Sequence, residues 1–234
     1  MKTLGLVGGM SWESTVTYYQ VINRRVREKV GGLHSAKCIV YSFDFAEIAH
    51  LQKSGQWEEA GVLMCKAAAY LQRAGADAIV ICTNTMHKVA ETVEQSSELP
   101  LLHIADATAD RIKRLGYERV GLLGTRYTME EKFYKNRLLE KFDLNVLIPE
   151  IEDRATVNRI IYDELCNGIL NDSSRQSLIR IIGELESDGA QCIILGCTEI
   201  GLLLKSGAVS LPLFDTATIH AQAAADWAME PAES

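Results

Sequence analysis

The fold class of this chain can be predicted from residues 75–85, GADAIVICTNT. A Gly-Ala pair closes a helical pattern, the apolar run 78–82 is typical of a buried strand, and small polar residues follow it. A strand that runs from one helix into the next is typical of a β-α-β unit in a parallel sheet. The polar residues 83–85 are therefore expected at the sheet edge where α/β proteins bind ligands.

The segment 189–199, GAQCIILGCTE, repeats this design in the second half of the chain. Counting from the Gly-Ala pair fixes the register of the repeat. Cys197 lies eight positions after Gly189, and the same count from Gly75 reaches Thr83, not the cysteine before it. The chain is therefore predicted to contain two similar halves whose strands end in Thr83 and Cys197.

Short apolar runs alternate with helical patterns along the whole chain, which predicts an α/β fold with parallel sheets flanked by helices. The repeat, together with a second similar pair, GLVGGMS at 5–11 and GLLGTRY at 121–127, predicts two similar domains related by pseudo-twofold symmetry. We expect residues 1–105 plus 209–234 in the first domain and 106–208 in the second. The expected strands are 4–7, 38–43, 78–82, 101–104, 119–124, 145–149, 192–196 and 211–214.

Composition favours a protein that acts on a small solute. The net charge of −7 argues against nucleic acid and membrane surfaces as partners, because both are anionic. Six cysteines without C-x-x-C spacing suggest a reducing, cytoplasmic location. The first 15 residues have too few apolar side chains for an export signal or a spanning helix.

The strand ends have the chemistry of a site for small anions. Gly8 and Gly9 allow a ligand to approach the backbone, and Ser11 is the predicted N-cap of a helix that begins near Trp12. Free N–H groups at helix starts favour carboxylates. Neither a P-loop nor a dinucleotide fingerprint is present, so nucleotide binding is not expected.

Two cysteines lie near the strand ends, and they are predicted to differ in role. Cys197 is expected at a helix start, where the dipole would lower the pKa of its thiol and make it an acid/base or a nucleophile. Strand alternation points Cys82 into the core. We also assign the remaining four cysteines to strand or helix faces: Cys38, Cys65, Cys166 and Cys192.

Other polar residues have two interpretations each. Thr125 is predicted either as a carboxylate or amino-group contact or as a helix N-cap. His87 is predicted either as a satisfied structural histidine or as a proton relay. The acidic run 150–154 is interpreted as a solvated helix start. Four further histidines lack ligand spacing, so no metal site is expected at His34, His50, His103 or His220.

Four segments together resemble the aspartate/glutamate racemase family: VGGMSWEST at 7–15, TNTMHK at 83–88, GT at 124–125 and GCTEIGLL at 196–203. The resemblance covers essentially the whole chain. It implies a cofactor-independent homodimeric enzyme acting on an amino acid, with two α/β domains and an active site in the cleft between them. One acid/base residue from each domain would act on opposite sides of the substrate Cα.

Three positions depart from the family pattern. Thr83 occupies the place of the first catalytic cysteine, so proton removal is expected to favour the L-enantiomer, which faces the second-half cysteine in the family. Gln52 is the nearest substitute for an arginine, and Glu164 takes the place of a lysine, both of which grip the distal carboxylate in aspartate-specific relatives. A less cationic side-chain pocket is therefore expected.

The predicted site combines a catalytic pair, Thr83 and Cys197, with residues that contact the substrate. The leading hypothesis is a racemase for aspartate or glutamate. The alternatives are a broad-specificity racemase that takes, for example, homoserine, a single-thiol decarboxylase or isomerase of small diacids, and a silent binding protein. The predicted substrate-binding residues are Met10, Ser11, Gln52, Asn84, Thr85, Thr125, Glu164 and Thr198.

Overall fold

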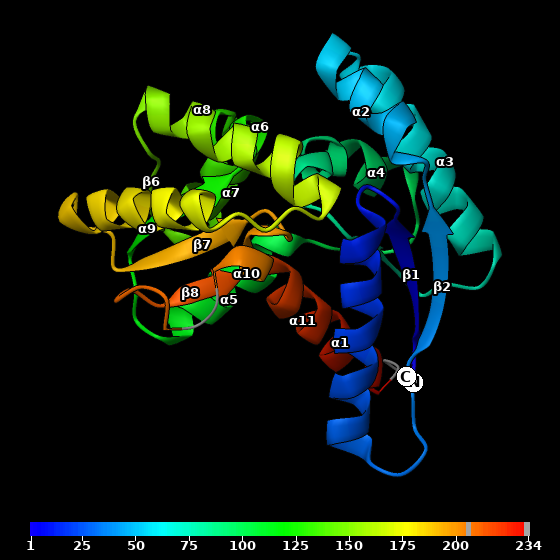
Figure 1. Cartoon of the computed structure of the whole chain (residues 1–234). Helices are drawn as coiled ribbons and strands as arrows, with labels where there is room; N and C mark the ends of the chain where they lie inside the picture. Colours follow the sequence, from blue (N-terminus) through cyan, green and yellow to red (C-terminus); the bar gives the residue numbers. More distant parts are fainter. Residues whose placement is uncertain (205–206, 232–234) are drawn as a thin grey trace. The chain divides into compact units, whose positions relative to one another are not determined.

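Two four-stranded parallel sheets flanked by helices form the fold, as the sequence predicts (Figure 1). The computed structural model describes residues 1–204 and 207–231. The chain divides into a first unit, Met1–Ile104 with Ala217–Ser234, and a second unit, Ala105–Thr216. The return to the first unit comes at Ala217 rather than at residue 209, because Leu213–Asp215 is a strand of the second sheet.

The first unit has the strand order β2-β1-β3-β4, with every neighbouring pair parallel. Helices lie between consecutive strands in the sequence, as in β-α-β units, and the last helix of the chain also belongs to this unit. Its elements are β1 (Thr3–Gly8), α1 (Trp12–Val30), β2 (Lys37–Ser42), α2 (Phe45–Ser54), α3 (Trp57–Arg73), β3 (Ala78–Ile81), η1 (Thr85–Val89), α4 (Ala90–Ser96), β4 (Leu101–Leu102) and α11 (Thr216–Met229).

Strand alternation gives this sheet two separate apolar faces. Val7 and Ile81 belong to the core formed with α2 and α3. Leu4 and Leu6 belong to the opposite core, formed with α1 and the buried alanines of α11. Both faces of the parallel sheet are therefore covered, which places the open binding edge at the strand ends.

The second unit has the equivalent strand order, β6-β5-β7-β8, again with parallel neighbours. The segment that follows α8 winds first as a π-helix and then as a 3₁₀-helix. The elements are α5 (Ile104–Arg114), β5 (Arg119–Gly124), α6 (Arg126–Glu130), α7 (Lys132–Phe142), β6 (Asn145–Leu147), α8 (Ile151–Arg159), η2 (Ile160–Glu164), η3 (Leu165–Asn167), α9 (Asp172–Ser187), β7 (Cys192–Gly196), α10 (Ile200–Leu203) and β8 (Leu213–Asp215).

The helix ends before β3 and β7 have the same construction. Gly75 and Gly189 both have φ +93°, a left-handed conformation that favours glycine. The alanine after each glycine donates its N–H back into the preceding helix, Ala76 to Leu71 O at 3.0 Å and Ala190 to Leu185 O at 2.9 Å. The Gly-Ala pair of the sequence repeat is therefore a helix stop that sets the start of each following strand.

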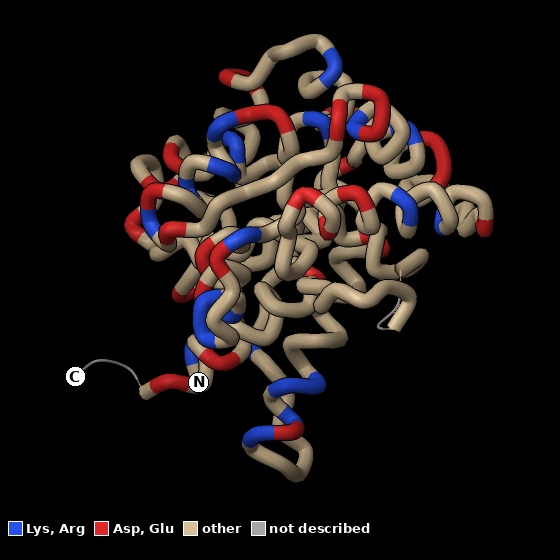
Figure 2. The backbone as a smooth tube through the Cα atoms, turned by 90° about the vertical axis from the view of Figure 1, so that its left-hand side faces the viewer, with Lys and Arg blue, Asp and Glu red and all other residues tan. Residues whose placement is uncertain are grey.

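Acidic and basic residues are interspersed along the helices in the view of Figure 2. Several form ion pairs, such as Arg25 with Asp226 at 2.8 Å and Arg154 with Glu130 at 3.1 Å. These pairs are partly exposed to solvent, and surface pairs of this kind contribute little stability, about 0–1 kcal/mol each. Among the helices of residues 1–204 and 207–231, none has the length and apolarity needed to cross a membrane.

Candidate active site

The turn after β1 brings a helix start against the end of the sheet. Gly9 has φ +84°, and a Cβ there would lie 2.2 Å from the carbonyl oxygen of Phe43, so only glycine fits. Ser11 is the N-cap of α1, and its Oγ accepts a hydrogen bond from the Ser14 N–H at 3.3 Å. The predicted cap at Ser11 is thus confirmed. Met10, between them, is buried in the core with α2 and α3.

The end of β3 separates Cys82 from Thr83. Cys82 is buried in the core that includes Val80, and its thiol lies 3.7 Å from the Val80 carbonyl oxygen. Burial and the nearby Cys38 raise the pKa of the Cys82 thiol far above its ordinary value, so it stays protonated. Thr83 is half-buried, and Asn84 and Thr85 after it are buried. The prediction that Cys82 is a core residue is confirmed.

Strand register makes Thr83 and Cys197 equivalent positions of the two units. Gly5 of β1 lies opposite Ile79 of β3, and Gly121 of β5 lies opposite Ile193 of β7. Thr83 lies four positions after Ile79, and Cys197 lies four positions after Ile193. The count made from the Gly-Ala pairs therefore agrees with the pairing inside each sheet.

Cys197 lies in a turn after β7, beside a carboxylate that we did not predict as a site residue. Its thiol donates to Glu199 Oε2 at 3.0 Å, and the Thr198 hydroxyl donates to the same oxygen at 2.8 Å. Cys197 and Glu199 are both buried. The carboxylate therefore receives two donors, and the thiol has an acceptor for its proton. The GCTE motif contains Glu199, but its backward orientation cannot be read from sequence.

The pKa of Cys197 is the reverse of our expectation. Burial and the negative charge of Glu199 hold the pKa of the thiol well above its ordinary value, whereas we predicted a lowered pKa. The helix after it, α10, has only four residues, and Glu199 is its N-cap, so the helix dipole is weak at this point. At rest, Cys197 is therefore a thiol that is hydrogen-bonded to the carboxylate of Glu199.

A tyrosine of η2 lies near Cys197. Burial raises the pKa of the Tyr162 hydroxyl, and the neighbouring ionisable groups of Cys197 and Tyr127 raise it further. Arg126 donates to the Tyr127 hydroxyl at 3.2 Å. Thr125 accepts from the Thr128 N–H at 3.4 Å as N-cap of α6, which confirms the cap interpretation of its hydroxyl. A π-helical turn such as η2 often marks a functional site.

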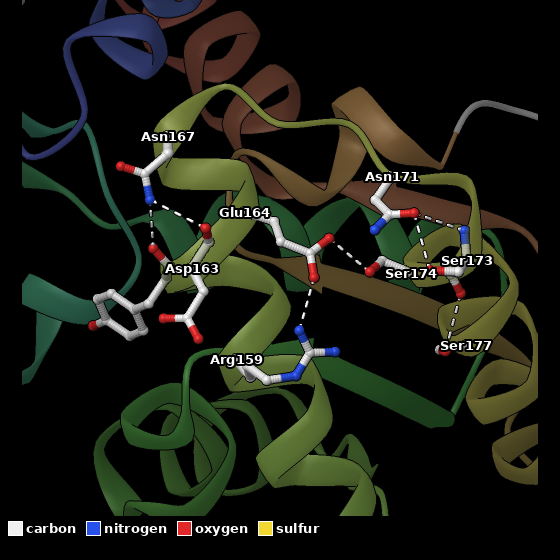
Figure 3. Close-up of polar contacts among 9 residues, drawn as sticks. Arg159, Asp163, Glu164, Asn167, Asn171, Ser173, Ser174 and Ser177 are labelled. Carbon is white, nitrogen blue, oxygen red and sulfur yellow. Dashed lines mark hydrogen bonds and ion pairs between the residues drawn. The ribbon is translucent and has the colours of Figure 1, made fainter.

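Glu164, at the end of η2, is held by two neighbours (Figure 3). Its Oε1 accepts from Arg159 at 2.8 Å, and its Oε2 accepts from the Ser174 hydroxyl at 2.6 Å. The hydrogen bond from Ser174 and the Arg159 charge lower the pKa of Glu164, so the carboxylate is ionised and compensated. Glu164 is therefore an ionised carboxylate whose negative charge is compensated by Arg159.

Gln52 lies on α2 and is buried against the segment that follows Thr83. Its amide donates to the Met86 sulfur at 3.2 Å. Met10 and Met86 belong to the same core. The first unit therefore gathers Met10, Gln52 and residues 83–86 in one region, and the second unit gathers Thr125, Cys197 and Thr198 around its own strand ends. In the described residues, no three His, Cys, Asp or Glu side chains are grouped to hold a metal ion.

The family model of Asp/Glu/hydantoin racemases matches residues 7–224, a span that contains every residue of the predicted site. A crystal structure of a candidate Asp/Glu racemase from Yersinia pestis is 57% identical, with a TM-score of 0.92 over 98% of this chain and 100% of that one. An aspartate racemase homologue from Pyrococcus horikoshii OT3 is 38% identical, with a TM-score of 0.85 over the same shares. The broad-specificity amino-acid racemase of Bacillus subtilis is 26% identical over 155 residues, 66% of each chain.

Proposed function

This chain belongs to the Asp/Glu/hydantoin racemase family and is an amino-acid racemase, and from that premise we propose that it interconverts the enantiomers of aspartate and glutamate, with Cys197 and Thr83 as its two proton-transfer groups. The observation that carries the proposal is the equivalence of these residues in register, one a thiol and the other a hydroxyl. Residues at equivalent strand ends are suited to the same role, here proton transfer at Cα, but a thiol is more acidic than a hydroxyl.

The proposed reaction removes the proton from Cα and returns one to the opposite face. Cys197 first loses its thiol proton to solvent, and the resulting thiolate takes the Cα proton of the L-substrate, which leaves a planar carbanion. The Thr83 hydroxyl then donates its proton to give the D-enantiomer. The alkoxide left on Thr83 is reprotonated by neighbours or water. No step in this sequence uses a cofactor, and we propose cofactor independence.

The side-chain pocket determines which amino acids react. Aspartate and glutamate are proposed because the relative with 57% identity is a candidate Asp/Glu racemase and the relative with 38% identity is an aspartate racemase homologue. A broader range, including homoserine, is the second candidate. It is favoured by the neutral amide of Gln52 and by the compensation of Glu164 by Arg159, since neither position offers a free cation for a distal carboxylate.

Chiral chromatography tests the proposal. Protein dialysed against EDTA and hydroxylamine is incubated separately with L-aspartate, L-glutamate and L-homoserine. We expect the D-enantiomer to form from aspartate or glutamate until both enantiomers are equal. Release of CO2 without D-product, or binding without turnover, would contradict racemisation of these substrates. Activity that is lost on dialysis and restored by pyridoxal phosphate or a divalent metal would contradict cofactor independence.

The pH profile should reveal the Cys197–Glu199 pair. Because burial and Glu199 raise the pKa of the thiol, the thiolate and hence the rate with L-substrate should increase on the alkaline side of neutrality. Glu199→Gln removes the negative charge, which lowers the thiol pKa, so the alkaline limb of kcat/KM should move to lower pH. Glu140→Gln on the exposed surface of α7 is the control with the same charge change. If the alkaline limb of kcat/KM does not move in Glu199→Gln, the Glu199 carboxylate does not set the pKa of the Cys197 thiol.

We also propose that the enzyme is a cytoplasmic homodimer. The homodimer follows from the family resemblance. The exposed apolar side chains of Trp12, Val16 and Tyr19 lie on one face of α1 and are of the kind that dimer interfaces bury. The reducing compartment is supported by the cysteines, all six of which lie in the described residues and are free.

Sedimentation equilibrium at micromolar concentration should give twice the chain mass of 25.9 kDa. A second run at tenfold dilution should give the same mass if the dimer is tight. A single species of the chain mass at both concentrations would refute the homodimer.

A further inference from the structure

The sequence leaves open whether His87 relays protons or supports the structure, and both of its ring nitrogens make main-chain contacts in the first unit. Nδ1 lies 2.7 Å from the carbonyl oxygen of Thr83. Nε2 accepts from the main-chain N–H of Ile104 at 3.2 Å. The ring is buried. One side chain thus joins the end of β3 to the start of α5.

These partners fix the protonation of the ring. A carbonyl oxygen only accepts, so Nδ1 must carry the hydrogen, and a main-chain N–H only donates, so Nε2 must present its lone pair. The ring is therefore neutral and in the Nδ1–H tautomer. A second proton would place an N–H against the Ile104 N–H. Such a ring is poorly suited to pass protons to a substrate, because both nitrogens are already committed.

The contact matters because of how the helix after Thr83 begins. η1 is a 3₁₀-helix, in which the His87 main-chain N–H bonds to Asn84 O at 3.0 Å. The carbonyl oxygen of Thr83, one residue before Asn84, contacts the His87 ring. At the other contact, Ile104 is the first residue of α5, where main-chain N–H groups have no partner within the helix. The ring therefore satisfies a polar group at each helix start.

Two more histidines pack against this ring, although we interpreted both of them as isolated residues without ligand spacing in the sequence. His103 packs edge-on at 4.4 Å between ring centroids, and His220 of α11 lies at 5.9 Å. His220 itself contacts the Tyr18 hydroxyl through Nδ1 at 2.8 Å and the Leu102 carbonyl through Nε2 at 2.7 Å. The orientation of His87 is therefore set by neighbours from three parts of the unit.

We propose that His87 is a positioning residue that holds the backbone of Thr83 so that its hydroxyl can deliver a proton, and that it does not itself transfer protons. This inference rests on the proposed role of Thr83. Under this proposal, two reactions of L-aspartate have different requirements. Exchange of the Cα hydrogen with solvent needs only Cys197, whereas racemisation also needs a correctly placed Thr83. Loss of the His87 ring should impair the second process and spare the first.

The test compares two variants, His87→Ala and His87→Asn. The matched control is His50→Ala, because His50 is an exposed histidine on α2. In deuterium oxide with L-aspartate, His87→Ala should lose at least about tenfold in racemisation while deuterium uptake into the remaining L-substrate stays within about threefold. His87→Asn, whose amide N–H can replace Nδ1–H, should recover much of the loss. His50→Ala should match the native enzyme. A parallel fall of exchange and racemisation in His87→Ala, or no fall in either, would overturn the proposal.

A second measurement does not depend on activity. Long-range ¹H–¹⁵N spectra of the histidine-labelled native protein at neutral pH should show one buried ring in the Nδ1–H tautomer, and this signal should be missing from His87→Ala. An Nε2–H or doubly protonated ring at His87 would refute the positioning role. If the native protein neither exchanges nor racemises any amino acid tested, the proposed function fails. The spectra still decide whether the His87 ring has the protonation that its contacts with Thr83 and Ile104 require.

Discussion

Cys197→Ser should lower racemisation of L-aspartate or L-glutamate by at least about a hundredfold, the loss expected when a positioned acid/base is removed. Serine has nearly the same size but replaces the thiol with a hydroxyl. Its alkoxide forms far less readily than a thiolate, so the proton on Cα of the L-substrate is no longer taken. Exchange of that proton with solvent should fall by the same factor, because both processes begin with the same step. Initial rates and deuterium uptake measure the two losses.

Cys82→Ala is the matched control for this substitution. Cys82 is buried among apolar side chains and its thiol contacts only the main-chain carbonyl at Val80 among the hydrogen bonds described, so its removal costs stability but not chemistry. We expect near-native turnover. If Cys82→Ala abolished activity while Cys197→Ser kept it, the register that makes Thr83 and Cys197 equivalent would not be the catalytic one.

The second large effect is a kinetic asymmetry caused by Thr83. A threonine hydroxyl donates a proton readily to a carbanion, but its alkoxide is almost never present to remove one. A cysteine, with a reference pKa near 8.5, can do both. We therefore expect L-substrate to exchange its Cα hydrogen faster than it racemises, and D-substrate to exchange slowly. Incubating each enantiomer separately in deuterium oxide and following uptake by mass spectrometry measures the difference.

Thermodynamics limits the form that this asymmetry takes. The equilibrium constant between enantiomers is one, so kcat/KM for racemisation must be equal in the two directions. The asymmetry therefore appears as excess exchange without inversion in the L-enantiomer, and as differing kcat and KM. Equal exchange rates for L- and D-substrate in the native enzyme would show that Thr83 does not limit proton removal.

Two variants at Thr83 separate its roles. Thr83→Cys supplies a group that can both accept and donate a proton, and we expect exchange of the D-substrate to increase by at least about tenfold. Thr83→Ala removes the donor, so racemisation should fall in both directions while exchange of the L-substrate through Cys197 remains. A Thr83→Cys enzyme as slow with D-substrate as the native one would contradict the assignment.

The parts of the site that were predictable depend on backbone register. A Gly-Ala helix stop sets the phase of the following strand, and the phase determines that Thr83, and not Cys82, is equivalent to Cys197. Ser11 was predictable for a similar reason, since an N-cap is a local contact between residues three apart. Periodicity along the chain contains this information, so no tertiary contact was needed.

The parts that could not be predicted depend on side chains that fold back or meet across the unit. The pKa of Cys197 was predicted in the wrong direction because sequence does not show that Glu199 turns towards the thiol or that α10 has only four residues. His87, His103 and His220 are far apart in sequence and meet only through tertiary packing. The short strand β8 was placed in the wrong unit because its pairing with β7 is not a local property.

The placement of α11 has a consequence for biosynthesis. The first sheet is translated early, yet one of its two faces is covered by alanines at the far end of the chain, including Ala217 and Ala221. As translation proceeds in the N-to-C direction, Leu4 and Leu6 leave the ribosome long before these partners exist. The second unit, by contrast, is one continuous segment, so all of its residues are present once Thr216 has emerged. The half of the protein that is synthesised first is therefore the half that is completed last.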